Sequence, residues 1–162
     1  RLTCAEVVEK GYLDADIWEQ VSTAAMNVFA RGQEVAKHAG LILVDTKYEF
    51  GHDEGKIYLI DEIHTPDSSR YFYADVYEEN QRLGLPQKQL SKEFVREWLI
   101  ANGFQGKEGQ IIPEMSDEWV EQISARYIEL FEKVTGKTFI KANTEDILGR
   151  IEENVLRSLT SH

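Results

Sequence analysis

The stretch Leu41-Ile-Leu-Val-Asp-Thr-Lys-Tyr-Glu-Phe-Gly51 decides how this chain is interpreted. Its first four residues are apolar, and three charged residues, Asp45, Lys47 and Glu49, then follow at two-residue spacing. Alternate residues of a β-strand point to one face, so a strand here places the charges on the same face as its two leucines. Such a face costs desolvation free energy unless a metal ion, a ligand or water meets the charges.

A second apolar run, Lys56–Glu62, predicts a partner strand. It follows the turn-like segment Gly51–Gly55, and two runs joined by five residues are typical of a β-hairpin. If paired residue numbers add up to an even number, Asp61 joins the charged face of the first strand. The opposite, apolar face then holds Val44, Tyr48, Tyr58 and Ile60. If the register slips by one residue, Glu62 takes the place of Asp61.

Either register predicts a carboxylate cluster on two strands, which suits Mg²⁺. This cation prefers oxygen ligands and typically takes one or two carboxylates together with substrate phosphates. The alternative interpretation is a solvated hairpin face with an ion pair between Lys47 and a neighbouring acid, because ion-pair networks also occupy strand faces.

The segment after the second strand, Asp61-Glu-Ile-His-Thr-Pro-Asp-Ser-Ser-Arg70, is polar and rich in turn-forming residues. Its hydroxyls, free backbone N–H groups and the guanidinium of Arg70 together predict a phosphate-binding loop. The alternative is an ordinary Asx or Ser turn beside a surface arginine. His64, inside this segment, is predicted to make local hydrogen bonds.

These two motifs, Leu43-Val-Asp-Thr-Lys-Tyr-Glu-Phe-Gly51 and Asp61 to Arg70, resemble the SAICAR synthetase (phosphoribosylaminoimidazole-succinocarboxamide synthase) family. That family shows a hydrophobic-Asp-x-Lys-x-Glu-Phe-Gly strand, an Asp-Glu strand end and a Pro-Asp-(Ser/Gly)-Ser-Arg loop. The segment Pro86–Trp98 resembles its longer members. The resemblance implies an α+β fold distantly like kinases and ATP-grasp proteins, here a β-hairpin packed by several helices.

The resemblance also implies a reaction. The family joins L-aspartate to the carboxylate of carboxyaminoimidazole ribonucleotide (CAIR), and cleaves ATP to ADP and phosphate. By motif position, Glu49 and Asp61 would bind Mg²⁺ and through it ATP, while Lys47 and Asp45 would act beside the nucleotide substrate. The CAIR side would be held by Asp67, Ser69 and Arg70.

The family carries an N-terminal lobe with a glycine-rich strand pair over ATP, and this chain shows no such segment. None of its eleven glycines forms a G-x-G-x-x-G or G-x-x-x-x-G-K loop. The chain also starts at Arg1 instead of Met. We therefore expect residues 1–162 to form a single domain, the C-terminal lobe, which supplies half of the active site and needs the N-terminal lobe as its partner.

Composition narrows the classes of partner and compartment. The net charge of −11 over 162 residues argues against nucleic acid and membrane surfaces as partners. One cysteine, Cys4, excludes an internal disulfide and suits the reducing cytoplasm. The four histidines, of which His162 is the last, are not paired at metal-binding spacing.

Helical periodicity and end signals predict five helices around the hairpin. They are a short helix opened by Thr3–Glu6, then Ala15–Ala39, Ser91–Asn102, Ser116–Val134 and Thr144–Leu159. The three tyrosine and phenylalanine residues of 71–73 are predicted to lie in the core. The last helix is predicted either to pack on the core or to form a contact in a homo-oligomer.

Two other functions fit parts of the pattern. An ATP-dependent kinase of similar fold, of the inositol-phosphate kinase type, also places a Pro-Asp loop and a metal-binding acid near ATP. The spacing of Asp45, Lys47 and Glu49 argues against it. A non-catalytic acidic module that binds a divalent cation or a partner protein is the third hypothesis.

Overall fold

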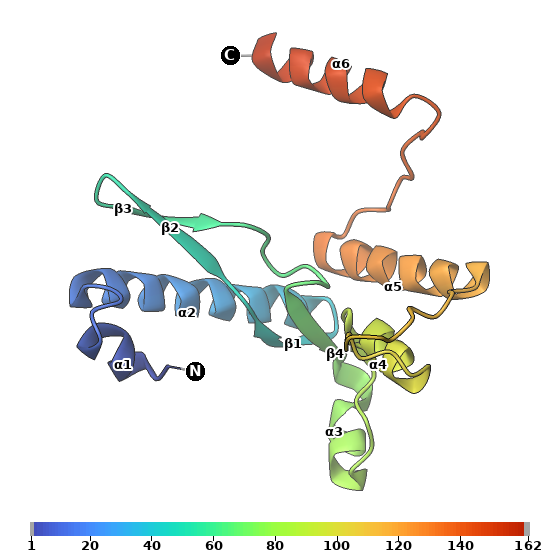
Figure 1. Ribbon diagram of the computed structural model, residues 1–162, viewed down its shortest axis with the longest axis horizontal. Coiled ribbons are helices and arrows are strands. Elements are labelled where there is room, and N and C mark those ends of the chain that lie inside the picture. The colour runs from blue at the N-terminus through green and yellow to red at the C-terminus, as the bar shows by residue number, and fades with distance from the viewer. Residues whose placement is uncertain (1, 161–162) are drawn as a thin grey trace.

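The computed structural model describes residues 2–160, so Arg1 and His162 lie outside the described part. It combines helices with two small antiparallel sheets, which confirms the predicted α+β fold (Figure 1). In chain order the elements are α1 (Cys4–Glu9), α2 (Ala15–His38), β1 (Leu41–Thr46), β2 (Glu49–Asp53), β3 (Lys56–Ile60), β4 (Ser69–Tyr73), α3 (Ala74–Leu83), β5 (Gln89–Leu90), α4 (Glu93–Ala101), α5 (Asp117–Thr135) and α6 (Ile147–Thr160).

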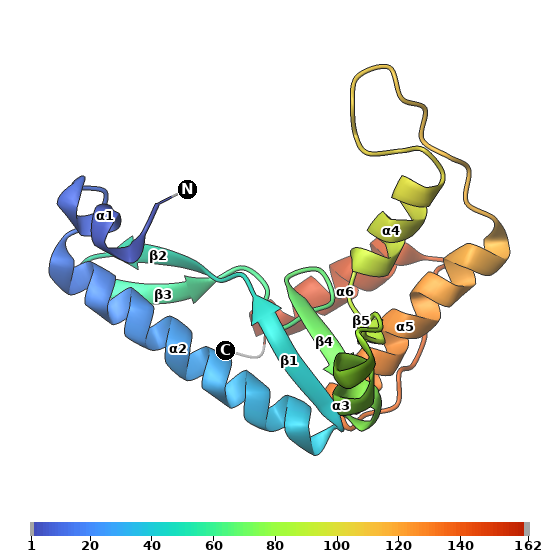
Figure 2. The same ribbon diagram turned by 90° about the horizontal axis from the view of Figure 1, so that it is seen from below.

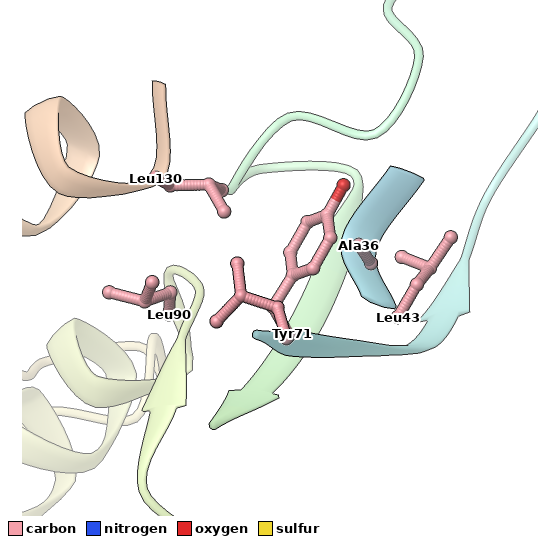
Figure 3. Close-up of a cluster of buried hydrophobic side chains, with 6 residues drawn as sticks. Ala36, Leu43, Tyr71, Leu90 and Leu130 are labelled. Atoms are coloured by element: carbon pink, nitrogen blue, oxygen red, sulfur yellow. The ribbon is translucent and has the colours of Figure 1, made fainter. Parts of the chain in front are cut away.

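The core lies where the sheet β1-β4-β5 meets α2 and α5 (Figures 2 and 3). Leu41 and Leu43 of β1, each 1% exposed, pack beside Tyr71 of β4. The buried cluster is completed by Ala36, Leu90 and Leu130. Tyr71 was correctly predicted to lie in the core, whereas Phe72 and Tyr73 are only partly buried.

A β-bulge at Val44 turns β1 from an apolar strand into a charged one. Leu43 pairs with Tyr71, but the next pair is Asp45 with Arg70, so Val44 is the extra residue. If the register of Leu41–Leu43 continued without a bulge, Asp45 would lie opposite Ser69, which is buried. A bulge re-aims the residues that follow it, so Asp45 leaves the face of the two leucines. The predicted strand face that is first apolar and then charged is therefore wrong.

The predicted hairpin is also wrong in its partners and its turn. β1 pairs with β4, and the hairpin is formed by β2 and β3 after a break at Lys47 and Tyr48. Its connection is the two-residue turn Glu54-Gly55, in which both residues have positive φ angles of 46° and 78°, as tight hairpin turns require. Residues 51–53 belong to β2, so the predicted five-residue connection over 51–55 is too long.

The hairpin register is the odd-sum alternative, because Glu49 pairs with Ile60. Asp61 follows the ladder instead of joining it, and its φ of 67° turns the chain away. Phe50 pairs with Leu59 on one side of the hairpin, and both residues line a cleft against α2. Tyr58 and Ile60, predicted on the apolar face, are exposed.

All five predicted helices are present, α4 and α6 begin later than predicted, and α3 is a helix that the sequence pattern did not predict. The Thr3–Glu6 capping box is complete, and Ser116 caps α5, which ends at the left-handed Gly136. α4 begins after Ser91, although the Ser91 hydroxyl still accepts the Glu93 N–H at 3.2 Å. α6 begins after Asp146 instead of Thr144, because the Asp146 carboxylate accepts the Gly149 N–H.

The α6 helix does not pack in the core. None of its described residues is buried, and an extended segment over residues 137–144 separates it from α5 (Figure 1). The predicted core role is therefore wrong, and the predicted oligomer contact stays a prediction. No helix within residues 2–160 is long and apolar enough to cross a membrane.

Gly32 allows α2 to approach β1 and the segment after β3. A Cβ atom at this position would lie 2.3 Å from Cε1 of His64 and 2.7 Å from Cδ2 of Leu43. Both distances are too short for carbon atoms, so glycine in the middle of this helix is required by packing. Helix propensity alone would mark glycine at this position as mildly destabilising.

We predict that Gly32→Ala destabilises the protein although alanine favours helices. The added methyl overpacks the contact with His64 and Leu43, which costs about 1–3 kcal/mol and outweighs a propensity gain of up to about 1 kcal/mol. Thermal denaturation measures the difference. The control is Ala30→Gly on the exposed side of α2, which measures the difference in helix propensity alone. An unchanged or higher melting temperature for Gly32→Ala would contradict the packing argument.

Candidate functional site

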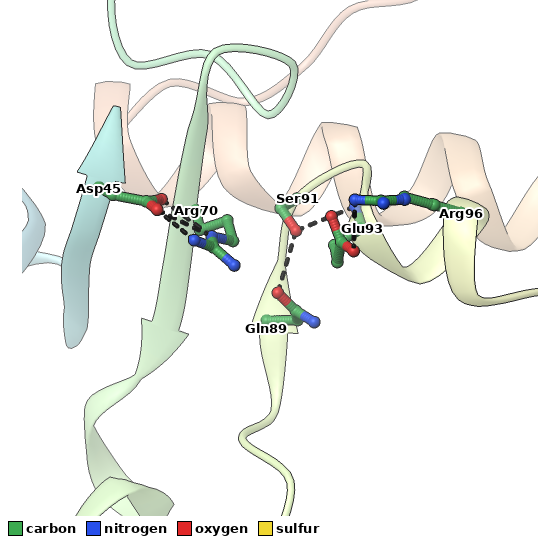
Figure 4. Close-up of polar contacts among 6 residues, drawn as sticks. All are labelled: Asp45, Arg70, Gln89, Ser91, Glu93 and Arg96. Atoms are coloured by element: carbon green, nitrogen blue, oxygen red, sulfur yellow. Dashed lines mark hydrogen bonds and ion pairs between the residues drawn. The ribbon is translucent and has the colours of Figure 1, made fainter. Parts of the chain in front are cut away.

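The predicted site residues form two ionic clusters on either side of the break after β1. In the first cluster, Arg70 of β4 donates from Nε to both carboxylate oxygens of Asp45, at 2.9 and 3.1 Å, and from Nη2 to Oδ2 (Figure 4). Both side chains remain nearly half exposed, at 46% and 49%. The hydrogen bonds from Arg70 lower the pKa of Asp45, so the carboxylate is ionised at neutral pH.

The second cluster is centred on Lys47, whose ammonium group is paired with Glu49. Hydrogen bonding to Glu49 raises the Lys47 pKa, and the negative charges of Asp61 and Glu62 act in the same direction. The structure therefore brings Lys47, Glu49 and Asp61 into one neighbourhood, as predicted. Glu62 joins them, and the Glu62 carboxylate accepts a hydrogen bond from the Thr65 hydroxyl.

The loop over residues 65–70 connects the two clusters. The Lys47 N–H donates to the carbonyl of Ser68 at 3.1 Å, and the Ser68 N–H donates to the Thr65 hydroxyl at 3.3 Å. Ser69 is only 4% exposed, and its hydroxyl donates to Thr46 at 2.9 Å. The structure thus places Ser69 under the loop, where it fastens the loop to β1, and its substrate-binding role stays a prediction.

Asp67 is fixed from a distant part of the chain. The Tyr127 hydroxyl on α5 donates to Oδ1 of Asp67 at 2.9 Å. Burial of the Tyr127 ring, together with Asp67, raises the Tyr127 pKa to about 12, so this hydroxyl keeps its proton. Sequence reasoning missed Tyr127, because nothing in its helical pattern distinguishes it from a packing residue.

A pocket of about 150 Å³ lies at the first cluster, between the loop and the start of α4. Besides Asp45 and residues 66–70, it is lined by Ser91, Lys92 and Glu93. Figure 4 shows Ser91 and Glu93 across from Arg70. The Lys92 N–H donates to the Pro66 carbonyl at 3.1 Å and so joins the two walls. The two-residue strand β5 creates this neighbourhood, and so short a strand leaves no periodic signal in a sequence.

Within residues 2–160, no group of three or more His, Cys, Asp and Glu side chains is arranged to hold a metal ion. The carboxylates that act on the Lys47 ammonium at the second cluster are those of Glu49, Asp61 and Glu62, and Glu49 is the one paired with it. Two carboxylates suit Mg²⁺ when substrate phosphates provide further ligands. The residues present therefore fit an ion that arrives with a phosphate ligand.

Comparison with known sequences identifies similar proteins over almost the whole chain. The sequence profile described as SAICAR synthetase matches residues 1–113. The phosphoribosylaminoimidazole-succinocarboxamide synthase of Bacteroides thetaiotaomicron is 57% identical over 96% of this chain and 49% of its own length. That of Legionella pneumophila (strain Paris) is 41% identical over 95% of this chain and 50% of its own length. The chain thus spans about half the length of these relatives.

Solved structures show the same fold. The SAICAR synthase from Saccharomyces cerevisiae complexed with SAICAR superposes with a TM-score of 0.71 and 34% identity, over 86% of this chain and 44% of the other. A type-2 SAICAR synthetase in complex with ADP superposes with a TM-score of 0.58 over 86% and 46%. At 23% identity, this second structure bears on the fold alone.

We predict that Arg70→Gln raises the pKa of Asp45 toward its ordinary value of 3.8. The substitution removes the charge-assisted hydrogen bonds that favour the ionised form of the Asp45 carboxyl group. Because the folded-state pKa lies below the unfolded one, the ion pair stabilises the fold above pH 3.8 and stops doing so as pH falls through the lowered pKa. For a half-exposed pair this stabilisation is at most about 1 kcal/mol.

Carbon-13 NMR of the Asp45 carboxyl group during an acid titration measures this change. The control is Arg96→Gln, because the Arg96 guanidinium pairs with Glu93 at 3.3 Å and is not bonded to Asp45. If Asp45 has the same pKa in Arg70→Gln as in the unchanged protein, the ion pair does not persist in solution.

Proposed function

Because this chain belongs to the SAICAR synthetase family, we propose that it forms part of an ATP-dependent ligase. The enzyme joins L-aspartate to the carboxylate of CAIR and releases SAICAR, ADP and phosphate, a step of purine biosynthesis. The observation that carries the proposal is that the family match over residues 1–113 includes both ionic clusters and the loop between them. The complex of a similar protein with SAICAR supports it.

The chemistry requires charge neutralisation more than a protein nucleophile. A carboxylate is a poor acyl donor, so an oxygen of the CAIR carboxylate takes the γ-phosphoryl group of ATP and ADP leaves. The aspartate amine then attacks the acyl carbon, an amide bond forms, and phosphate leaves. Phosphoryl transfer of this kind depends on positioned cations, and Lys47 and Arg70 are the cations at the two clusters.

Arg70 is suited to a phosphate or carboxylate of CAIR. Its contacts with Asp45 use Nε and Nη2, so Nη1 is the nitrogen that meets a ligand oxygen. Asp67 stands on the same pocket wall, held by Tyr127. Asp45 orients the Arg70 guanidinium and acts beside the nucleotide substrate together with Lys47.

Glu49 and Asp61 would hold Mg²⁺ with the phosphates of ATP. When bound, this ion neutralises charge on the transferring phosphoryl group. Lys47 is paired with Glu49, and its ammonium group would be directed at the transferred phosphoryl group once this pair opens.

The chain covers about half the length of its relatives. We propose an N-terminal lobe of the same protein as the second half of the ATP site, and the cytoplasm as the compartment, where a single cysteine stays reduced. The exposed apolar residues of α6 are the surface on which a homo-oligomer would form.

The test is ADP release by the full-length protein with CAIR and L-aspartate together, and with each one omitted. We expect release only when both are present, and a loss of at least about 100-fold in Asp61→Asn and Arg70→Ala, since each removes charge stabilisation of the transferring group. Asparagine tolerates the left-handed backbone at Asp61, so this variant changes the charge without straining the chain.

Matched controls are Asp53→Asn at the tip of the hairpin and Arg31→Ala on α2, where Arg31 pairs with Glu34 at 2.9 Å. Both should keep full activity. ADP release without aspartate would favour the kinase alternative. No release with any combination would leave the non-catalytic acidic module as the better account.

We also predict that Glu49→Gln raises the Mg²⁺ concentration needed for half-maximal ADP release by about tenfold, because one of two carboxylate ligands is lost. Calorimetric titration of Mg²⁺ with ADP gives a second readout that does not need turnover. Glu54→Gln, at the hairpin turn, is the control. An unchanged Mg²⁺ requirement in Glu49→Gln would remove this residue from the metal site.

A further inference from the structure

His64 lies at the junction between the hairpin and the loop that carries Asp67 and Arg70. Its φ of 56° is in the left-handed region, which residues other than glycine rarely adopt. Its carbonyl accepts a hydrogen bond at 2.9 Å from the hydroxyl of Tyr71, a core residue. The backbone of His64 is therefore held in an unfavourable conformation by the surrounding fold, which is a common feature of functional segments.

The imidazole ring of His64 reaches across to the other motif. Its Nε2 lies within hydrogen-bonding distance of the Tyr48 hydroxyl, and the two rings meet edge to face with centroids 5.6 Å apart. Tyr48 stands between Lys47 and Glu49, in the break where the chain belongs to neither β1 nor β2. The side chain of Tyr48 is thus tied to the second motif at the point where its own motif has left the sheets.

The third side of the His64 ring is closed by α2. A Cβ atom on Gly32 would lie 2.3 Å from Cε1 and 2.8 Å from Nδ1 of His64. The ring is therefore flanked by Tyr48, by α2 and by its own constrained backbone. A side chain held in this way couples the position of the segment around Tyr48 to that of the loop after His64.

The Tyr48 hydroxyl and Nε2 of His64 share one hydrogen bond, and the imidazole tautomer determines which of the two groups donates. Phenylalanine at position 48 removes this hydrogen bond and leaves the ring contact in place.

We propose that His64 is a positioning residue, which fixes the Lys47–Glu49 pair relative to the loop of Asp67 and Arg70 through its contact with Tyr48. The inference rests on the proposed ligase function, because it assigns the two clusters to one reaction. Neither His64 nor Tyr48 touches the reacting groups. They act by holding the two clusters at the separation that a substrate spanning both requires.

The test is steady-state ADP release by the full-length protein in the variants Tyr48→Phe, His64→Ala and the double variant. We expect kcat to fall about tenfold or more in each single variant, since small misplacements of catalytic groups have effects of this size. The double variant should be no slower than His64→Ala, because the two residues act as one unit. His64→Gln, whose side-chain amide replaces Nε2 in this hydrogen bond, should recover most of the lost kcat.

Two matched controls separate positioning from general stability. Tyr58→Phe makes the same change on an exposed face of β3, and His52→Ala removes a histidine from β2. Both should leave kcat unchanged. A structural role alone would lower the melting temperature of Tyr48→Phe and His64→Ala and leave kcat, measured well below that temperature, within twofold of the original.

The outcomes are distinguishable. An active original protein whose two single variants keep kcat within twofold would overturn this inference and leave the proposed function standing. Effects that multiply in the double variant would also overturn it, because the two residues would then act independently. No ADP release by the original protein would overturn the proposed function and the inference together.

Discussion

The pairing of β1 with β4 is the constraint on which the rest of the structure depends. Leu41 and Leu43 pack beside Tyr71 in the only buried apolar cluster that the described residues form. That cluster fixes the register at one end of the pair, and the bulge at Val44 changes it at the other. One extra residue therefore lets a single strand bury its leucines and still present Asp45 to Arg70 on the opposite side.

The pairing of β1 with β4 also determines the position of the loop over residues 65–70. Ser69 and Arg70 begin β4, so the residues before them cross the end of β1, where Lys47 and Thr46 bond to the loop. The loop is thus short, anchored at both ends and joined by Lys92 to the start of α4. Site residues on a scaffold of this kind are positioned by sheet geometry instead of by loop flexibility.

The two motifs identified the charged residues that the structure gathers into two clusters, because charged side chains at fixed spacing stand out in a sequence. The roles of these residues stay predictions. The motifs could not reveal the bulge at Val44, since one apolar residue more or less leaves the alternation plausible. They also led to the wrong partner for β1, because neighbouring strands usually pair and the hydrophobic run of β3 stands closer in sequence than β4. The three-residue contact of Gly32, His64 and Tyr48 joins parts of the chain that no short-range pattern connects.

The ion pair of Asp45 and Arg70 has a consequence for the strength of anion binding. Asp45 already occupies Nε and Nη2 of the guanidinium fork. If Arg70 binds a ligand anion, as we propose, Nη1 is the nitrogen left for it, and the neighbouring carboxylate repels the anion. Such a pair would hold substrate and product more weakly than an unpaired arginine, and would therefore release both sooner.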